Sequence, residues 1–359
     1  MEKCKIMDNA DMNFPDKTEL PLVSVIIPCY NEEKLIGGCL DSLIDNTYPQ
    51  QKIEVLVYDG GSTDNTCAIV KNYENKYSFI KLKNNPNQFQ AYGVNQGIKE
   101  SNGEIIVRCD AHAEYSSNYI INLVGWLKKD KMIGNAGGIL INKPANSSYK
   151  ACGIADALSH QFCVGPNSFR TGVKCPTFVD TVPFGCWRKE IFGEVGAIDE
   201  TFLRAQDLEF NMRLKKAGYK ILLDPEIKIY YYTRENFKKL YSMMFQYGYW
   251  KVVLNKKLEI ISSWRQFAPP FFVLYLFALA VLFPLIPLVL VPLGIYMVLC
   301  LIFGLKVSLK EKNINILPFC CLTFIVTHIG YGLGYLKGII DVFILKKKKP
   351  VGKYSEVTR

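Results

Sequence analysis

The sequence has few histidines and lacks the cysteine spacings of metal or redox sites. It contains 3 histidines and 12 cysteines, and no two cysteines are separated by two residues. That spacing is typical of structural zinc sites and thiol redox motifs. Apart from the adjacent Cys320 and Cys321, the cysteines are scattered singly. We therefore expect reduced, mostly buried thiols, with neither a zinc site nor a disulfide framework.

A targeting segment is also missing from the amino terminus. Residues 1–20 are polar and carry charged side chains, among them Lys3, Lys5 and Asp8. A secretory signal needs an apolar core of 7–15 residues, which this stretch does not contain. We therefore expect a polar tail at 1–20, followed by a globular part that stays in the cytosol.

Charge is absent from the stretch between Phe267 and Leu305, and residues 314–345 carry only Lys337 and Asp341. Runs of this length predict a membrane region at 266–345. Prolines near the centre of the first run favour two crossings there, and a third apolar segment follows, so we expect two to three hydrophobic helices.

The side of the membrane that holds the basic tail at 346–359 stays open. Net charge is +10, and basic residues gather near the apolar segments, including Lys346–Lys349 directly after them. This clustering favours contact with anionic lipids and not with nucleic acid. Three crossings would place the tail outside, against the positive-inside rule, whereas an interfacial third segment would keep it inside.

Four apolar stretches early in the chain predict buried strands. They are Leu22–Pro28, Glu54–Tyr58, Lys76–Leu82 and Ile105–Val107, and segments with helical spacing separate them. Alternating strands and helices of this kind indicate an open α/β sheet. Such sheets bind ligands at the carboxyl ends of their strands.

Polar side chains follow two of these strands. Asp110 and His112 come directly after Ile105–Val107, and Asp59 opens an Asp-Gly-Gly-Ser turn after the second strand. A carboxylate and an imidazole on alternate residues can both reach one divalent ion, so we predict that Asp110 and His112 hold Mg²⁺ or Mn²⁺. The alternative is a strand end followed by a solvated turn.

Several of these segments together resemble the nucleotide-sugar half of family 2 glycosyltransferases, which have the GT-A fold. The matching stretches are Val23–Glu32, Glu54–Thr66, Ala91–Gly97 and Gly103-Glu104. The resemblance implies a Rossmann-like mixed sheet flanked by helices and a nucleotide-sugar donor, with a UDP-sugar favoured. It places donor binding at Pro28, Tyr30, Asn31, Glu32, Asp59, Ser62 and Arg108.

Two positions depart from the commonest family pattern. The family usually has Asp-x-Asp where this chain has Asp110-Ala111-His112, although ExoA-like transferases of succinoglycan-type exopolysaccharide synthesis resemble this chain there. Many members also have a second acid where this chain has Gly60. The base contact then falls to Asp59 alone.

The acceptor half begins after Gly137-Gly138, which we predict as an exposed turn in the sheet. Residues 142–178 are rich in polar and small residues and predict a mobile insertion that helps cover the site. The stretch Val179–Arg188 resembles the family's acceptor wall, which places acceptor binding at Phe184 and Gly185. A strand with a tight turn packed beside the sheet is the alternative.

Asp207 is the candidate general base. An inverting transfer needs a carboxylate to take the proton of the acceptor hydroxyl. The resemblance assigns this role to the Asp of a Glu-Asp pair, where this chain has Gln206-Asp207. A purely favourable charge at a helix amino terminus is the alternative.

An aromatic stretch, Gln246–Lys251, precedes the membrane region. Processive relatives carry Gln-x-x-Arg-Trp there, and this chain keeps Gln246 and Trp250 but has Tyr249 in place of arginine. The resemblance makes Gln246 and Trp250 acceptor-binding residues, and a helix that packs its aromatics on the domain is the alternative.

We therefore expect a cytosolic GT-A domain at 21–265, divided into a nucleotide-sugar half (21–115) and an acceptor half (116–265), on a multi-pass membrane anchor. The expected reaction is inverting transfer of a hexose such as glucose to a polyprenyl-linked saccharide, in cell-surface or exopolysaccharide synthesis. A processive polysaccharide synthase is one alternative. A membrane-anchored nucleotide-sugar binding protein without turnover is another.

Overall fold

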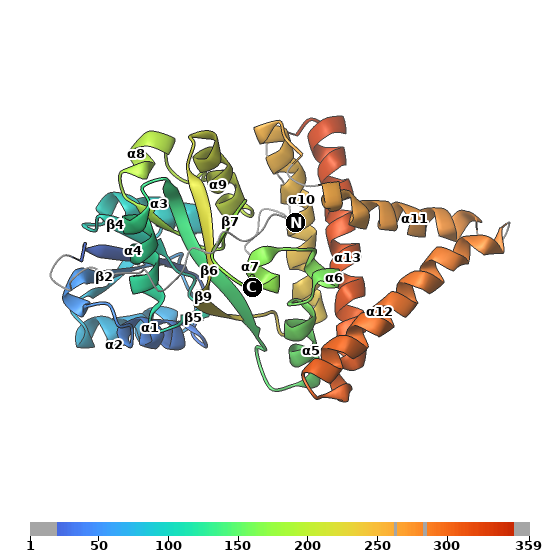
Figure 1. Cartoon of the computed structure of the whole chain (residues 1–359), viewed down its shortest axis with the longest axis horizontal. Helices are drawn as coiled ribbons and strands as arrows, with labels where there is room; N and C mark the ends of the chain where they lie inside the picture. Colours follow the sequence, from blue (N-terminus) through green and yellow to red (C-terminus); the bar gives the residue numbers. More distant parts are fainter. Residues whose placement is uncertain (1–19, 262–263, 283–285, 348–359) are drawn as a thin grey trace. The chain divides into compact units, whose positions relative to one another are not determined.

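The computed structural model describes residues 20–261, 264–282 and 286–347 (Figure 1). Within these ranges the chain forms two compact units, which divide at Ile141/Asn142, Thr171/Gly172 and Tyr231/Tyr232. The first unit holds the sheet. The second holds the carboxyl-terminal helices together with residues 142–171. This division differs from the expected boundary at residue 265, because residues 142–171 and 232–261 group with the apolar helices in the second unit.

The first unit is built on one mixed sheet, with the strand order β3-β2-β1-β4-β8-β6-β9-β5 and β7 paired to β9 among the described residues. Pairing is parallel between β1 and its neighbours β2 and β4, and antiparallel between β4 and β8. The strands are β1 (Val23–Cys29), β2 (Ile53–Asp59), β3 (Ile80–Asn84), β4 (Ile105–Arg108), β5 (Ala113–Tyr115), β6 (Ile133–Lys143), β7 (Thr177–Val179), β8 (Cys186–Arg188) and β9 (Lys220–Tyr232).

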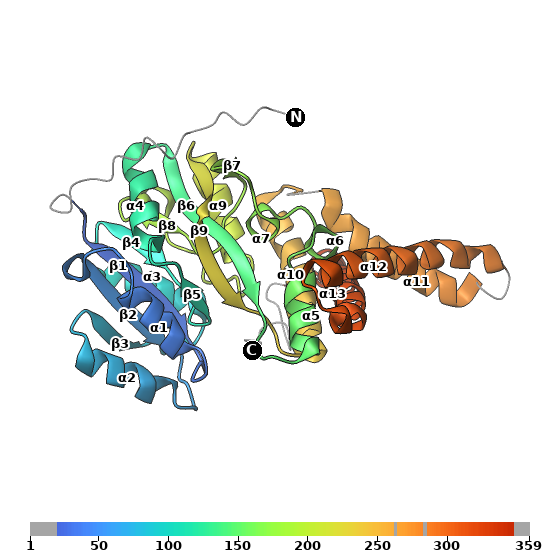
Figure 2. The same ribbon diagram turned by 60° about the horizontal axis from the view of Figure 1, so that its bottom comes forward.

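Helices flank this sheet on both faces. The chain runs from β1 to β2 to β3 in one direction and then returns past β1 to β4, so right-handed crossovers place α1 and α2 on one face and α3 on the other (Figures 1 and 2). The helices of this unit are α1 (Ile36–Ile44), α2 (Thr66–Lys76), α3 (Gln90–Glu100), α4 (Tyr119–Lys129), α8 (Ile191–Val195) and α9 (Gln206–Lys216), with the short 3₁₀ helix Gln50–Lys52.

The four predicted strands are confirmed, and the first two sit in the sheet interior. Every residue of β1 is buried, as expected for a strand that is apolar on both faces. The third begins later than predicted, at Ile80, because Lys76 still belongs to α2.

The turn predicted at Gly137-Gly138 is wrong, since both residues lie inside β6. A Cβ added at Gly138 would stand 2.0 Å from the carbonyl oxygen of Ile227, and one at Gly137 would stand 2.6 Å from the Val182 side chain. These glycines therefore allow neighbouring chain segments to approach closely and do not bend the chain.

Most of residues 149–171 are helical, so the mobile insertion predicted over 142–178 is wrong in this part. The segment forms α5 (Tyr149–Ala157), α6 (Gln161–Val164) and α7 (Ser168–Thr171). Ile154, Leu158 and Cys163 are buried in one apolar cluster with residues of the carboxyl-terminal helices. These helices are short, and their few buried apolar residues stand among small and polar ones. The composition of the segment therefore favoured a loop.

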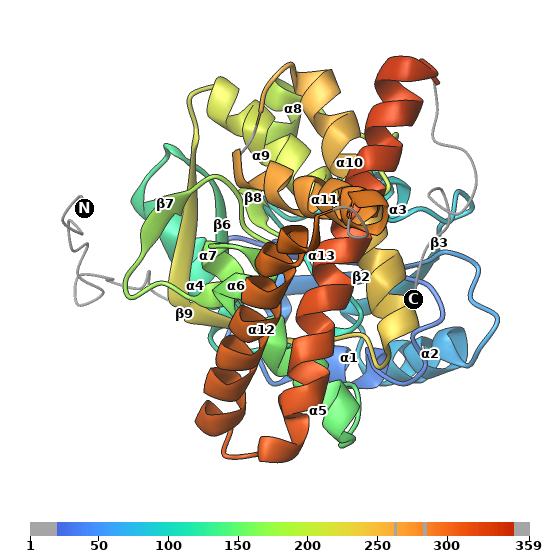
Figure 3. The same ribbon diagram turned by 90° about the vertical axis from the view of Figure 1, so that its right-hand side faces the viewer.

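The second unit contains the long helices α10 (Phe237–Leu258), α11 (Ala268–Leu282), α12 (Val291–Lys310) and α13 (Leu317–Ile339). Short elements join them: the 3₁₀ helices Trp264–Phe267, Pro287–Leu290 and Ile314–Ile316, and the π-helix Ile340–Ile344. Figure 3 shows α11, α12 and α13 from their own side. Within the described residues, three helical stretches are long and apolar enough to cross a membrane: Trp264–Leu282, Leu288–Lys310 and Ile314–Ile344.

Ten cysteines of the described residues are free thiols, and most are buried. Cys175 is disulfide-bonded, so the expectation of reduced thiols is wrong at this position. No cysteine spacing in the sequence indicated a bond at Cys175.

Candidate active site

Two loops at the carboxyl ends of β1 and β2 are joined by hydrogen bonds. The backbone N–H of Asn31 donates to Ser62 Oγ (2.8 Å), and Asn31 Oδ1 accepts from the backbone N–H of Thr63 (2.8 Å). The backbone N–H of Glu32 donates to Thr66 Oγ1 (2.7 Å). The predicted donor-binding residues Asn31 and Ser62 therefore lie together, held by contacts between the two loops.

Asp59 organises its own turn. One carboxylate oxygen accepts the N–H groups of Gly61 (2.9 Å) and Ser62 (3.0 Å), and the other accepts from Ser62 Oγ (2.5 Å). The structure also explains why position 60 is a glycine: an added Cβ would lie 2.9 Å from the carbonyl oxygen of Gln88. The second acid of many relatives would not fit this backbone without a shift of the loop.

The remaining predicted donor residues flank these loops. Pro28 is buried in β1 beside Tyr58, and Tyr30 is half-buried just after the strand. Both lie at the ligand-binding end of the sheet, as expected from the strand order.

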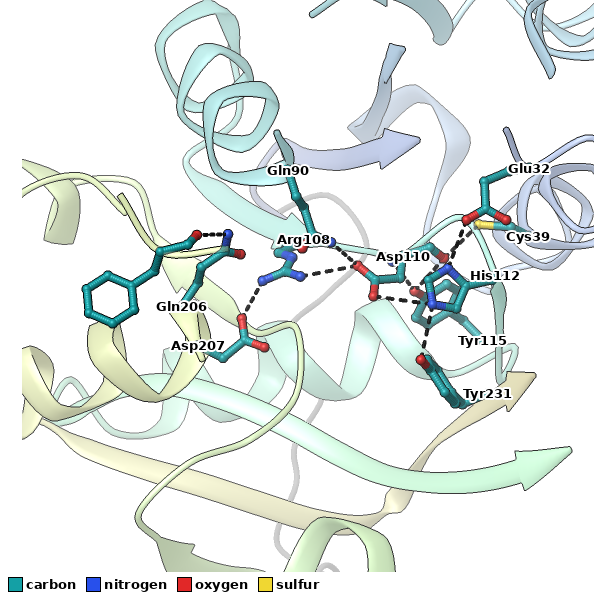
Figure 4. A network of polar contacts seen from close by, with 11 residues as sticks. Glu32, Cys39, Gln90, Arg108, Asp110, His112, Tyr115, Gln206, Asp207 and Tyr231 are labelled. Carbon is teal, nitrogen blue, oxygen red and sulfur yellow. Dashed lines mark hydrogen bonds and ion pairs between the residues drawn. The ribbon is translucent and has the colours of Figure 1, made fainter. Parts of the chain in front are cut away.

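Arg108 joins the two candidate acids. Its guanidinium is buried at the end of β4 and forms ion pairs with Asp110 Oδ1 (3.2 Å) and with Asp207 (Figure 4). Asp110 Oδ1 also accepts from Gln90 Nε2 (2.8 Å) at the start of α3. The predicted metal ligand and the predicted base are far apart in sequence, and one cation brings them together.

These contacts set the charge states at the centre of the site. Burial raises the pKa of Asp207 to about 6, with the nearby Asp110 adding to the rise, while Arg108 and the backbone N–H of Phe184 oppose it. Burial alone would lower the pKa of Arg108, but the facing carboxylates of Asp207 and Asp110 raise it overall. Arg108 thus stays cationic, and Asp207 titrates close to neutral pH.

His112 lies between two polar side chains. Its Nδ1 is 3.2 Å from Glu32 Oε1, and its Nε2 is 3.2 Å from the hydroxyl oxygen of Tyr231. A carboxylate accepts only, so Nδ1 must carry the proton that is donated to Glu32. In the neutral ring the lone pair of Nε2 accepts from Tyr231, and a bound cation would take the place of that donor.

Asp110 and His112 fit a shared divalent ion. His112 Nε2 stands 3.9 Å from Asp110 Oδ2, and this separation is less than roughly 4.2 Å, twice the ~2.1 Å length of a metal–ligand bond. No group of three or more His, Cys, Asp or Glu side chains is placed to hold an ion among the described residues. The protein would therefore supply two ligands, and phosphate oxygens and water would supply the others.

The turn before β8 is in the left-handed backbone region. Phe184 has φ +61° and Gly185 has φ +116°. Such a conformation is unusual for phenylalanine, and here it aims the Phe184 N–H at Asp207. The Phe184 ring is 4% exposed and lies 5.8 Å from the Arg108 guanidinium. Phe184 was predicted to bind the acceptor. In the structure its backbone N–H, and not its ring, faces the candidate base Asp207.

Asp207 lies in the first turn of α9, as predicted, and its side chain is 31% exposed. Gln206, which replaces the family's usual glutamate, is buried and donates to the carbonyl oxygen of Phe202 (2.6 Å). Glu209 is fully buried and pairs with Arg213, which also donates to the carbonyl oxygens of Val195 and Ala197. Asp207 is thus the solvent-accessible acid of this turn.

Gln246 and Trp250 belong to the second unit. Both are buried in α10, at 1% and 3% exposure. The structure therefore does not bring these two predicted acceptor residues together with Asp207 in one compact unit, and their role stays a prediction.

The contacts made by Gln90, Tyr231 and Asn95 were not predicted from sequence. Asn95 on α3 accepts from the N–H of Ile198 (3.0 Å) and donates to its carbonyl oxygen (2.8 Å), so it ties the donor half to the segment before α9. Tyr231 lies in an aromatic run at the end of β9. Because successive side chains of a strand point to opposite faces, alternation places Tyr231 on the other face from Tyr230 and Tyr232, and this was the one sequence signal that distinguished it.

Comparison with known proteins finds relatives among glycosyltransferases. A family model described as Glycosyl transferase family 2 matches residues 24–196. A dolichyl N-acetyl-α-D-glucosaminyl phosphate 3-β-D-2,3-diacetamido-2,3-dideoxy-β-D-glucuronosyltransferase of Methanococcus voltae is 30% identical over 327 residues, which cover 89% of this chain and 97% of the relative. The succinoglycan biosynthesis protein ExoA of Rhizobium meliloti (strain 1021) is 26% identical, over 88% of this chain and 94% of the relative.

A solved structure supports the fold. The mannosyltransferase PcManGT from Pyrobaculum calidifontis, solved in complex with GDP-Man and Mn²⁺, superposes with a TM-score of 0.63 at 19% identity, covering 91% of this chain and 89% of that one. The predicted GT-A fold with apolar carboxyl-terminal helices is thereby confirmed. This chain belongs to glycosyl transferase family 2 and is a glycosyltransferase.

Proposed function

We propose that this protein is a membrane-anchored, inverting glycosyltransferase that moves a sugar from a UDP-sugar to a lipid-linked saccharide, with the catalytic unit in the cytoplasm. The observation that carries the proposal is the bridge from Asp110 through Arg108 to Asp207. In this bridge one buried cation, Arg108, pairs with both Asp110, the candidate metal ligand near the diphosphate, and Asp207, the candidate base. The sugar is proposed to be glucose or a related hexose.

Asp207 acts as the general base in this proposal. Its carboxylate takes the proton of the acceptor hydroxyl while that oxygen attacks the anomeric carbon from the face opposite the leaving nucleoside diphosphate. A pKa of about 6 leaves the group ionised at neutral pH and still basic enough to accept a proton. Arg108 keeps this carboxylate in position between reaction cycles.

Asp110 and His112 would hold a divalent cation, Mg²⁺ or Mn²⁺, together with the donor diphosphate. When bound, the ion supplies charge neutralisation at the leaving group. Donor binding is proposed for the joined loops and the end of β4, through Pro28, Tyr30, Asn31, Glu32, Asp59, Ser62 and Arg108. Acceptor binding is proposed for Phe184, Gly185, Gln246 and Trp250.

Two findings support a lipid-linked acceptor. The relative from Methanococcus voltae is named for a dolichyl-linked substrate, and it is covered almost completely by this chain. Three apolar stretches also give the chain the means to stay at a bilayer, which is where a polyprenyl-linked saccharide presents its hydroxyl group.

A donor screen tests the proposal. Full-length protein in vesicles would be given UDP-, GDP- and TDP-sugars with native lipid-linked saccharides, and transfer of labelled sugar to the lipid fraction would be measured. We expect transfer from a UDP-hexose that requires added cation and disappears in Asp207→Asn. Transfer from a GDP-sugar instead would overturn the donor assignment, and donor binding without transfer or hydrolysis would overturn catalysis.

A further inference from the structure

The three apolar helices of the second unit differ in what surrounds them. In α11 and α12 many apolar side chains are exposed, among them Phe271 (66%), Phe277 (61%), Ile295 (57%) and Leu301 (55%). In α13 no residue from Thr323 to Ile339 is exposed. A helix that crosses a bilayer beside few partners presents apolar side chains to lipid. This describes α11 and α12, whereas α13 is enclosed by other helices, including α11 beside Gly332 and α12 through the contact of Tyr296 with His328.

One side of α13 is covered by α10, which lies beside it (Figure 1). Glycines allow the two backbones to meet: a Cβ at Gly330 would lie 3.2 Å from the carbonyl oxygen of Tyr241, and one at Gly334 would lie 2.0 Å from that of Phe245. Farther along, Lys256 Nζ donates to the carbonyl oxygen of Val342 (3.2 Å). The two helices are therefore in contact from Tyr241 and Gly330 to Lys256 and Val342, and they must lie at a similar depth relative to a bilayer.

The charges of α10 do not suit the hydrocarbon core of a bilayer. It carries lysines toward both ends, at 238, 239, 251, 256 and 257. The charge-free stretch between them, Leu240–Trp250, is 11 residues long, or about 16 Å at 1.5 Å per residue. That is roughly half the ~30 Å thickness of a bilayer core. Any depth that buried α13 in the core would also carry Lys251 or Lys239 into it.

The first half of α13 is covered by α5 and α6. A Cβ at Gly153 would lie 2.6 Å from the Phe319 side chain, Cys163 Sγ donates to Thr327 Oγ1 (3.5 Å), and His328 Nε2 is 2.8 Å from the carbonyl oxygen of Phe162. The segment that holds α5 and α6 enters from β6 and returns to β7. It also carries the polar side chains of Lys150 and Asp156.

We infer that α13 lies along the membrane surface beside α10 and does not cross the bilayer. The apolar hairpin of α11 and α12 alone enters the hydrocarbon core, with Tyr275 joining its arms through a donated bond to the carbonyl oxygen of Val289 (2.7 Å) and an accepted bond from the N–H of Leu293 (3.0 Å). The helices α10 and α13 would contact the headgroup region of the bilayer.

Two consequences follow for the chain's topology. Both ends of α13 lie on the side of α10, and so the basic tail lies on that side too, in agreement with the positive-inside rule. The charged group at the end of the helix also has a suitable environment: Asp341 is buried between Lys337 Nζ (2.6 Å) and Lys347 Nζ (3.1 Å).

Protease-cleavable tags that flank α13 test the inference in the full-length chain. One tag is inserted between Lys312 and Asn313, a second follows Arg359, and a third precedes Met1 as a reference for the first unit. Each tagged protein is exposed to protease in sealed vesicles of both orientations, and tag release is measured by blotting.

We expect all three tags to be cleaved in the same vesicle orientation and protected in the other. α13 and the π-helix after it are continuous from Leu317 to Ile344, so a helix with both ends on one side cannot have dipped through the core and returned. If the tags at 312 and 359 are cleaved in opposite orientations, α13 crosses the bilayer and the inference is wrong.

Discussion

Removing the charge of Arg108 should move the pH dependence of the reaction. Arg108 pairs with both Asp110 and Asp207, and it holds the pKa of Asp207 down against burial. An adjacent arginine lowers a carboxyl pKa by about 1–3 units. In Arg108→Gln the pKa of Asp207 should therefore rise from about 6 by roughly 1–3 units.

The consequence for rate follows from the ionised fraction. With a pKa of about 6, about nine-tenths of Asp207 is ionised at pH 7, and a rise of roughly 2 units leaves about one-tenth ionised. The acidic limb of kcat/KM reports this group in the free enzyme. Arg108→Gln should thus lose about tenfold in kcat/KM at pH 7 from protonation alone and regain that part near pH 9.

Arg108→Lys is the matched control, because lysine keeps the positive charge but cannot bridge two carboxylates with a rigid fork. It should weaken donor binding while leaving the acidic limb close to its wild-type position. The decisive measurement is kcat/KM from pH 5 to 9.5 for all three proteins. An acidic limb that does not move in Arg108→Gln would refute Asp207 as the titrating base.

Three further predictions concern single sites and the anchor. Asp207→Asn should lower kcat by roughly 10²–10⁴-fold with little change in donor affinity, because an amide cannot accept the proton. Its control Glu209→Gln should keep kcat but lose about 1–3 kcal/mol of unfolding free energy through its pair with Arg213; a reversal of the two phenotypes would move the base to Glu209. Asp110→Ala should abolish cation-dependent donor binding in calorimetry, and His112→Asp should retain part of it because an oxygen ligand is restored; full binding in chelator would contradict both. Truncation after Arg265 should give an aggregated product, because α5 and α10 lose the helix that covers their apolar faces; a soluble monomer on gel filtration would count against this packing.

The parallel half of the sheet could be predicted because its strands are apolar on both faces and end abruptly in polar residues. Ile105–Val107 ends in this way at Asp110, and the rule that ligands bind at the carboxyl ends of strands then located the site. Asp207 could be predicted only through the resemblance, since an acid in the first turn of a helix is common for electrostatic reasons alone.

Contacts between distant segments could not be predicted. Nothing in the sequence indicates that Arg108 would bridge Asp110 and Asp207, or that Glu32 would face His112 Nδ1. Each of these contacts depends on how loops cross at the end of the sheet. Packing of α5 against α13 was hidden for the same reason, because its buried residues meet partners more than 150 residues away, such as Cys320 Sγ near the carbonyl oxygen of Gly153.

The contact made by Asn95 has a consequence for building chimeric enzymes. Its side-chain amide pairs with both main-chain groups of Ile198, much as a neighbouring strand would. Every residue at position 198 except proline offers the same two groups. Donor halves from relatives should therefore be exchangeable onto this acceptor half wherever the incoming segment keeps an asparagine at position 95, whatever side chain stands at 198. The exchange should fail to give a tight junction when that asparagine is lost, even if the sheet itself matches perfectly.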